Sequence, residues 1–242
     1  MIGLGTIVNS AAIIAGGTAG VLAKSGLPER YRETIMQALG LAVLIIGLSG
    51  CLQGIFMINS SGSLDRQFVM LMIFSLVIGG LLGEFMNIEL RLERAGLWIQ
   101  SKIGGAGGNF SEGFVSASLL YCVGAMAIVG SLEDGLTGST STLFAKAVLD
   151  GVSAVIFGAT LGIGVAFSAV PVFIYQGSIT LLAGLIKPWL TETVILQTSL
   201  VGSVLIMAIG FNLLEIKKIK AGNMLPAVFI PLVYYVIVSI IQ

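Results

Sequence analysis

One carboxylate stands out because it lies inside an apolar segment. Asp150 falls within the apolar run 147–168, about two helical turns after Leu143. An ionisable side chain at membrane depth is costly, so it points to a function such as binding a cation or a proton. Lys146 lies one helical turn earlier on the same face, and a purely structural ion pair is the competing interpretation.

A second polar group lies just before this segment. Residues 130–142 read GSLEDGLTGSTST, with the neighbouring carboxylates of Glu133 and Asp134 among glycines and hydroxyls. Such oxygen donors suit a hard cation or a proton path. Adjacent side chains diverge on a helix, so we do not expect the two carboxylates to share one ligand. The alternative is a solvated loop in which Thr142 or Ser141 caps the next helix.

Further polar residues lie in or at the ends of other apolar runs. Asn9 is inside the first run, whereas Glu84 and Asn212 come near the ends of the third and seventh. These last two would line an inner exit, or else reach water and pair with Arg91 or Lys217. The predicted ion or proton pathway therefore consists of Asp150, Glu133, Asp134, Lys146, Asn9, Glu84 and Asn212.

The composition decides the class of protein. Of 242 residues, 56% are hydrophobic and 10% charged, and the mean hydropathy is +1.04. Soluble domains carry roughly 25% charged residues, so this chain is predicted to be a membrane protein. Twelve basic residues balance twelve acidic ones, which leaves no positive excess for nucleic acid. Without histidine, Ser-His-Asp triads and His-ligated zinc or haem are excluded.

No Walker loop, HExxH, nucleophile elbow or CxxC motif occurs, so we predict neither an enzyme nor a cofactor. The substrate that these residues suggest is a small cation or a proton, and the identity of any bound metal stays open. An enzyme that acts on lipid also stays open, although no nucleophile and base can be recognised. Cys51 and Cys122 each sit in an apolar run and are interpreted as small hydrophobic residues rather than a disulfide or metal pair.

Eight apolar runs are long enough to span a bilayer, which takes about 20 residues. They cover residues 4–23, 34–57, 67–86, 113–132, 147–168, 170–187, 194–214 and 224–241. We predict an all-α bundle of about eight transmembrane helices that forms one integral membrane domain, 1–242. The fifth and sixth runs are joined only through 169–171, so a half-inserted or broken helix at Pro171 is the alternative.

The basic residues predict the orientation. Nine of the twelve fall in the connections 24–33, 87–110 and 215–223, which are therefore expected in the cytoplasm, with both termini outside. The connection 87–110 is amphipathic, with Trp98 among leucines and charges, and suits the cytoplasmic membrane interface. The glycine-rich tract 104–109 then leads into the fourth run.

The 33 glycines predict close helix packing. Gly16 and Gly20 form a small-residue stripe, and Asn9, seven residues before Gly16, points toward the same seam. Related phrases begin at Ile14, Val77 and Ile156, and the spacing Gly16–Pro28–Gly40 resembles Gly158–Pro171–Gly184. Repeats 1–132 and 143–242 in the same orientation are one interpretation, and compositional similarity is the other. The glycine stripes also favour a homodimer.

Several phrases in one order resemble a known family. They are Asn9 with Gly16-Gly17 and Gly20, Leu27-Pro28-Glu29-Arg30, Gly83-Glu84, Glu133 with Gly135 and Thr137-Gly138, Ala145-Lys146 with Leu149-Asp150, and Asn223-Met224-Leu225-Pro226-Ala227. The chain resembles the domain-of-unknown-function 554 family of bacterial inner-membrane proteins. This resemblance implies a small multi-pass protein of the inner (cytoplasmic) membrane and no established activity.

Two functions remain open at this point. The first is a transporter or channel for a small cation, coupled or not to protons, that uses the intramembrane carboxylates. The second is a non-transporting membrane scaffold or regulatory partner, supported by the small-residue packing faces and the amphipathic segment.

Overall fold

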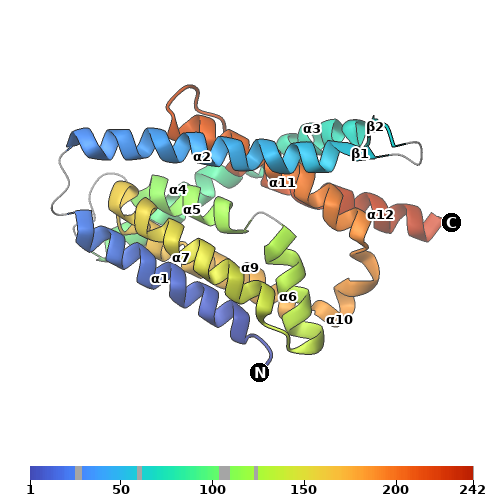
Figure 1. Ribbon diagram of the computed structural model, residues 1–242, viewed down its shortest axis with the longest axis horizontal. Coiled ribbons are helices and arrows are strands. Elements are labelled where there is room, and N and C mark those ends of the chain that lie inside the picture. The colour runs from blue at the N-terminus through green and yellow to red at the C-terminus, as the bar shows by residue number, and fades with distance from the viewer. Residues whose placement is uncertain (25–28, 59–61, 104–109, 123–124, 242) are drawn as a thin grey trace. The chain divides into compact units, whose positions relative to one another are not determined.

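The chain folds almost entirely into helices (Figure 1). A computed structural model describes residues 1–24, 29–58, 62–103, 110–122 and 125–241. Seven helices in this part of the chain are long and apolar enough to cross a membrane, and a helix pair bent by 61° provides an eighth candidate. The predicted all-α, multi-pass membrane fold is therefore confirmed. Pro28 and the tract 104–109, on which parts of our sequence interpretation rest, lie outside the described residues.

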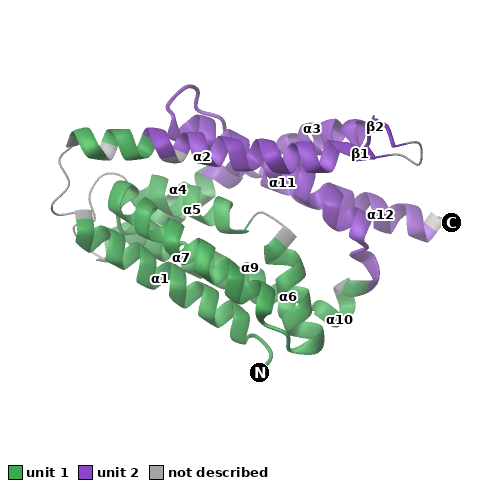
Figure 2. Ribbon diagram, viewed as in Figure 1, with its two compact units in different colours: residues 1–36, 90–122, 126–187 green, residues 37–89, 123–125, 188–242 purple. Residues whose placement is uncertain are grey.

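The helices form two compact units (Figure 2). Unit 1 comprises residues 1–36, 90–122 and 126–187, and unit 2 comprises residues 37–89, 123–125 and 188–242. Each unit combines segments that are far apart in the sequence. Neither unit coincides with the repeats 1–132 and 143–242, and the duplication stays a prediction.

Unit 1 is built around two long neighbouring helices, α1 and α7. Its elements are α1 (Leu4–Lys24), α4 (Ile88–Ile103), α5 (Phe110–Cys122), α6 (Ala125–Thr137), α7 (Ser141–Leu161), α8 (Gly164–Phe167), α9 (Ala169–Leu181) and α10 (Ala183–Ile186). The first residue or two of α4 and α6 belong to unit 2. Helices α5, α8 and α9 pack around this central pair.

The contact between α1 and α7 depends on the predicted glycine stripe. A Cβ atom placed on Gly16 would lie 3.1 Å from the Cβ of Ala154 and would collide with the carbonyl oxygen of Gly151. A Cβ on Gly20 would lie 2.8 Å from the backbone nitrogen of Ala159. Residue numbers rise together along the contact, so the two helices run parallel and their backbones nearly touch.

Unit 2 consists mainly of antiparallel helices. Its elements are α2 (Glu29–Ile55, whose first residues belong to unit 1), β1 (Phe56–Ile58), β2 (Leu64–Arg66), α3 (Val69–Met86), α11 (Glu192–Leu213), η2 (Gly222–Phe229) and α12 (Ile230–Ile241). The short η1 (Lys187–Trp189) precedes α11. A small core of Val201, Leu205, Ala227 and Val228 holds α11 to η2. Glycines again allow close contacts, since a Cβ on Gly47 would lie 2.6 Å from the Cγ of Met207.

Three predicted spans differ from the structure. The fifth span ends at Leu161, where Gly162 adopts a φ of 87° that favours glycine, rather than at 168. Pro171 does not form the junction with the sixth span; it lies in the first turn of α9, where a backbone N–H has no intrahelical partner anyway. The fourth span is not one straight helix but the bent pair α5 and α6.

A further difference concerns the segment 130–142. Helix α6 continues to Thr137, and α7 begins at Ser141, so only 138–140 connect the two helices. The interpretation of the whole segment as a solvated loop is therefore wrong. The antiparallel pairing of β1 with β2, between α2 and α3, was also missed, because three-residue strands carry too little periodicity to be recognised.

Candidate functional site

The centre of the candidate site is an ion pair inside α7. The ammonium nitrogen of Lys146 lies 3.0 Å from Oδ1 and 2.9 Å from Oδ2 of Asp150. The helical repeat brings the two side chains to one face, because they are four residues apart. Their side chains are only 9% and 8% exposed, so the pair is shielded from both water and lipid.

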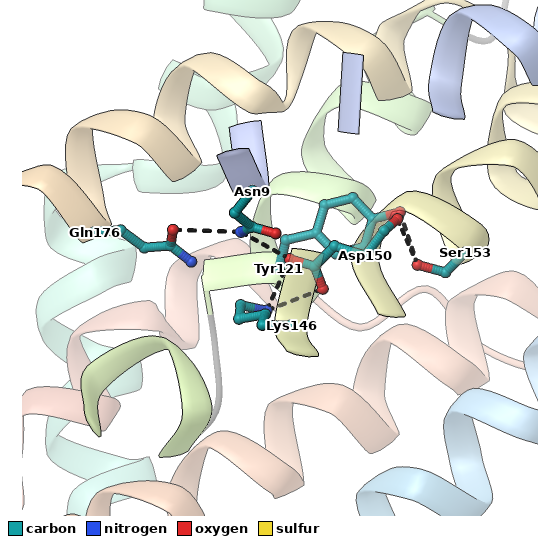
Figure 3. A network of polar contacts seen from close by, with 6 residues as sticks. All are labelled: Asn9, Tyr121, Lys146, Asp150, Ser153 and Gln176. Carbon is teal, nitrogen blue, oxygen red and sulfur yellow. Dashed lines mark hydrogen bonds and ion pairs between the residues drawn. The ribbon is translucent and has the colours of Figure 1, made fainter. Parts of the chain in front are cut away.

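Two amides from other helices complete the arrangement (Figure 3). The Nδ2 group of Asn9, on α1, donates to Oδ2 of Asp150 at 3.1 Å and to Oε1 of Gln176, on α9, at 3.3 Å. Asn9 and Gln176 are fully buried. Asn9 therefore links the carboxylate of α7 to α9, and polar groups from three helices of unit 1 form one cluster.

A tyrosine and a serine extend this cluster beyond the predicted residues. The Ser153 hydroxyl lies 3.2 Å from the Tyr121 hydroxyl, on α5, and 3.0 Å from the backbone oxygen of Asp150. Ser153 is three residues after Asp150, so its place on the same helical face could have been read from the sequence. The approach of Tyr121 could not, because it depends on the packing of α5 against α7.

Several buried polar atoms of unit 1 have no hydrogen-bond partner among the described residues. They are Thr6 Oγ1, Asn9 Oδ1, Ser10 Oγ, Ser131 Oγ, Gln176 Nε2 and Thr180 Oγ1. Buried polar atoms are usually satisfied, by protein groups or by ordered water. Two of these atoms belong to Asn9, which bonds to Asp150, and to Gln176, which bonds to Asn9, so the cluster has capacity to bind a further polar species.

The two neighbouring carboxylates of α6 diverge, as expected. Asp134 is fully buried and accepts hydrogen bonds from the backbone N–H groups of Gly3 at 2.9 Å and Gly5 at 3.0 Å. It therefore satisfies N–H groups at the start of α1 that have no intrahelical partner. Glu133 instead accepts from the Thr142 hydroxyl at 2.7 Å.

The expected cap of α7 is absent. The residue at its N-cap position is Thr140, and no side chain there caps the helix. Thr142 bonds to Glu133 instead, so the prediction that Ser141 or Thr142 caps this helix is wrong.

Glu84 and Asn212 both belong to unit 2, whereas the residues of the Asp150 cluster belong to unit 1. Glu84 accepts from Lys220 at 2.7 Å and from Asn223 at 2.6 Å, so its partner is Lys220 and not Arg91. The hydrogen bond to Glu84 raises the pKa of Lys220. Asn212 exchanges two hydrogen bonds with the backbone of Ile219 and thereby closes the loop after α11.

The Glu84 group repeats the chemistry of the Asp150 group. In each, a carboxylate accepts from the Nδ2 of an asparagine and from the ammonium of a lysine. The difference is exposure, because the side chains of Glu84 and Lys220 are 52% and 59% exposed. The exposed pair provides a natural control for experiments on the buried one.

The amphipathic segment forms α4, as its pattern predicted. Gly96 packs against Ser111 and Phe114 of α5, whereas Leu97 and Trp98 are exposed. This distribution is typical of a helix at a membrane interface.

Comparisons with known proteins agree with the membrane fold and show the family. The model of the family described as "Protein of unknown function (DUF554)" matches residues 4–236. The chain is 35% identical over 227 residues to the "Uncharacterized membrane protein YdfK" of Bacillus subtilis (strain 168), covering 94% of this chain and 93% of that protein. It is 32% identical over 232 residues to the "Uncharacterized protein YqgA" of Escherichia coli (strain K12), covering 94% of each. No solved structure matches. The chain therefore belongs to the DUF554 family of membrane proteins.

Proposed function

We propose that this chain moves a small cation across the bacterial inner membrane, with proton coupling, and that Asp150 is the carboxylate that binds the ion. The observation that carries the proposal is the Asp150 cluster: a carboxylate in the interior of a spanning helix, bonded to Lys146 and Asn9, in which Asn9 and its partner Gln176 each keep one buried polar atom without a hydrogen-bond partner among the described residues.

Stability alone is a weak reason to keep such a cluster. Replacing a buried ion pair by apolar residues of similar size is often neutral or stabilising. An unpaired charge at the centre of a spanning helix costs at least about 2.5 kcal/mol on insertion scales. Burial of Lys146 and Asp150 therefore carries a desolvation cost. The neighbouring amides of Asn9 and Gln176 also leave buried polar atoms without a hydrogen-bond partner among the described residues. A binding role explains both features.

Reconstitution tests the proposal directly. Purified protein in liposomes should take up Na⁺ or K⁺ down an imposed gradient, and Asp150→Asn should abolish this uptake while leaving the helical content and insertion unchanged. Asp65→Asn, in the exposed strand β2, is the matched control and should transport normally. Full transport by a well-folded Asp150→Asn variant would exclude Asp150 as the ion site.

The scaffold alternative has lost one of its supports. It relied on small-residue faces available to other proteins, but Gly16, Gly20 and Gly158 are in contact with helices of the same chain. The exposed side of α4 is the feature that still favours it.

A further inference from the structure

We propose that the exposed side of α4 binds the headgroups of anionic phospholipids at the cytoplasmic surface of the membrane. The ligand class is a lipid whose headgroup carries a net negative charge, and the binding residues are Arg91, Arg94, Lys102 and Trp98. This role is independent of cation transport and concerns a helix that the proposed function does not use.

The two sides of α4 differ in their surroundings. Buried and half-buried side chains recur at positions 88–89, 92–93, 96 and 99–100, which is the repeat of one helical face. On this inward side, Gly96 packs against Ser111 and Phe114 of α5. The exposed side chains lie between these positions in the sequence and therefore occupy the opposite side of the helix.

The exposed side carries apolar side chains that suit lipid tails. Leu90 and Leu97 are 42% and 55% exposed, and Trp98 is 63% exposed. At 3.6 residues per turn, the two leucines lie together at one edge of the exposed side, and Arg91 and Lys102 lie toward the other edge. Such a division, with tryptophan at the level of the headgroups, is the geometry of a helix that lies in the interface.

The charged side chains on the exposed side are all positive. They belong to Arg91, Arg94 and Lys102. The two glutamates of α4 lie on the inward side instead: Glu89 accepts a hydrogen bond from the first backbone N–H of η2 at 3.1 Å, and Glu93 is half-buried. The helix contains both signs of charge, but it presents only the positive one outward.

These three cations have no hydrogen-bond or ion-pair partner in the part of the chain that the structure describes. An exposed lysine elsewhere in the protein does have one, because Lys220 pairs with Glu84 at 2.7 Å. Unpaired cations beside exposed apolar side chains fit a surface that offers negative charge and hydrocarbon together. A bilayer that contains anionic lipid offers both.

The place of α4 in the chain brings its start to the membrane surface. The candidate span α3 ends at Met86, Asn87 turns the chain with a φ of 51°, and α4 begins at Ile88. One connecting residue leaves no length of chain to carry the start of α4 away from the headgroups. The excess of basic residues in 87–110 predicts the cytoplasmic side, where the membrane surface is negatively charged.

Quenching of tryptophan fluorescence tests lipid contact at this site. Trp98 and Trp189 are the two tryptophans of the sequence, so Trp189→Phe leaves Trp98 as a single probe. The full chain would be reconstituted in phosphatidylcholine bilayers that contain brominated phosphatidylglycerol or, separately, brominated phosphatidylcholine. Brominated acyl chains quench a tryptophan that they contact. At equal mole fraction, the brominated phosphatidylglycerol should quench Trp98 more strongly.

Three substitutions remove the charges with little change in helix propensity: Arg91→Gln, Arg94→Gln and Lys102→Gln. Each basic side chain near an anionic surface contributes about five-fold to binding, so the single variants should weaken the preference stepwise. The triple variant should be quenched equally by both lipids. Lys217→Gln with Lys218→Gln is the matched control, because these exposed lysines belong to another connection that is predicted on the same side, and it should keep the preference.

The inference is overturned if Trp98 shows no preference for phosphatidylglycerol, or if the triple variant keeps that preference. If the triple variant does not fold, the single variants decide in the same way. Absence of quenching by either lipid would mean that another protein or a second copy of the chain covers α4, which also overturns the inference. Loss of the preference in the control would show that the lipid is attracted by the charge of the whole cytoplasmic side and not by α4.

Discussion

At the scale of residues, the chain uses two buried carboxylates in different ways. Asp150 is paired with a lysine of its own helix, whereas Asp134 binds backbone N–H groups about 130 residues away in sequence. The first pairing could be predicted, because it follows from helical spacing. The second could not, and neither could the bonds of Asn9, because they depend on which helices become neighbours.

Asp134 should therefore matter for stability. Asp134→Asn replaces one carboxylate oxygen by an amide nitrogen, which cannot accept a hydrogen bond from Gly3 or Gly5. We expect the free energy of unfolding to fall by about 1–3 kcal/mol, the cost of an unsatisfied buried donor. Thermal unfolding in detergent measures this loss. In Glu133→Gln the Thr142 bond survives, since an amide oxygen can still accept it, and equal melting of the two variants would refute the assigned role.

At the scale of elements, the apolar runs were read correctly but their interruptions were not. Hydropathy reports how long a segment stays apolar, and it does so for α1, α3 and α11 to within a few residues. It is silent on backbone conformation, so the turn at Gly162 and the bend between α5 and α6 were missed. The glycine stripe of α1 was recognised from the sequence. That it packs against α7 could not be predicted, because this contact depends on the tertiary arrangement of the helices.

The close contact between α1 and α7 predicts that adding a single methyl group at Gly16 lowers the stability of the protein. Gly16→Ala would push a Cβ into the Gly151 carbonyl and separate the helices that carry Asn9 and Asp150. Overpacking of this kind costs about 1–3 kcal/mol. In Gly177→Ala, on α9, the new Cβ meets nothing within 4 Å, and better helix propensity should add up to about 1 kcal/mol of stability. Melting temperatures that do not separate the two variants would contradict the close packing.

At the scale of the whole molecule, packing directions within each unit restrict the number of membrane crossings. Helices α1 and α7 run parallel, so a chain that spans the membrane at both must cross an odd number of times between them. Helices α2 and α3 account for two crossings, which makes the bent pair α5–α6 the third. In unit 2, α2 and α11 run antiparallel, since Gly40 contacts Leu214 and Gly54 contacts Leu200. An even number of crossings must separate them, and α8–α9 must then cross as well.

These directions predict eight crossings, a number that apolar length alone left at seven or eight. Single cysteines, in a background with Cys51 and Cys122 replaced by alanine, test the prediction through a membrane-impermeant thiol reagent on intact cells. Cysteines that replace the exposed residues Asp65, Ser139 and Glu192 should react from outside the cell. Each of these positions lies at the start of a helix that is expected to run from the outside toward the cytoplasm. Lys102 and Lys217 should react only after lysis, since their connections carry the excess of positive charge that is retained in the cytoplasm. Were α5–α6 to enter and leave on one side, Ser139 would label together with Lys102, and the parallel packing of α1 on α7 could not exist in a membrane.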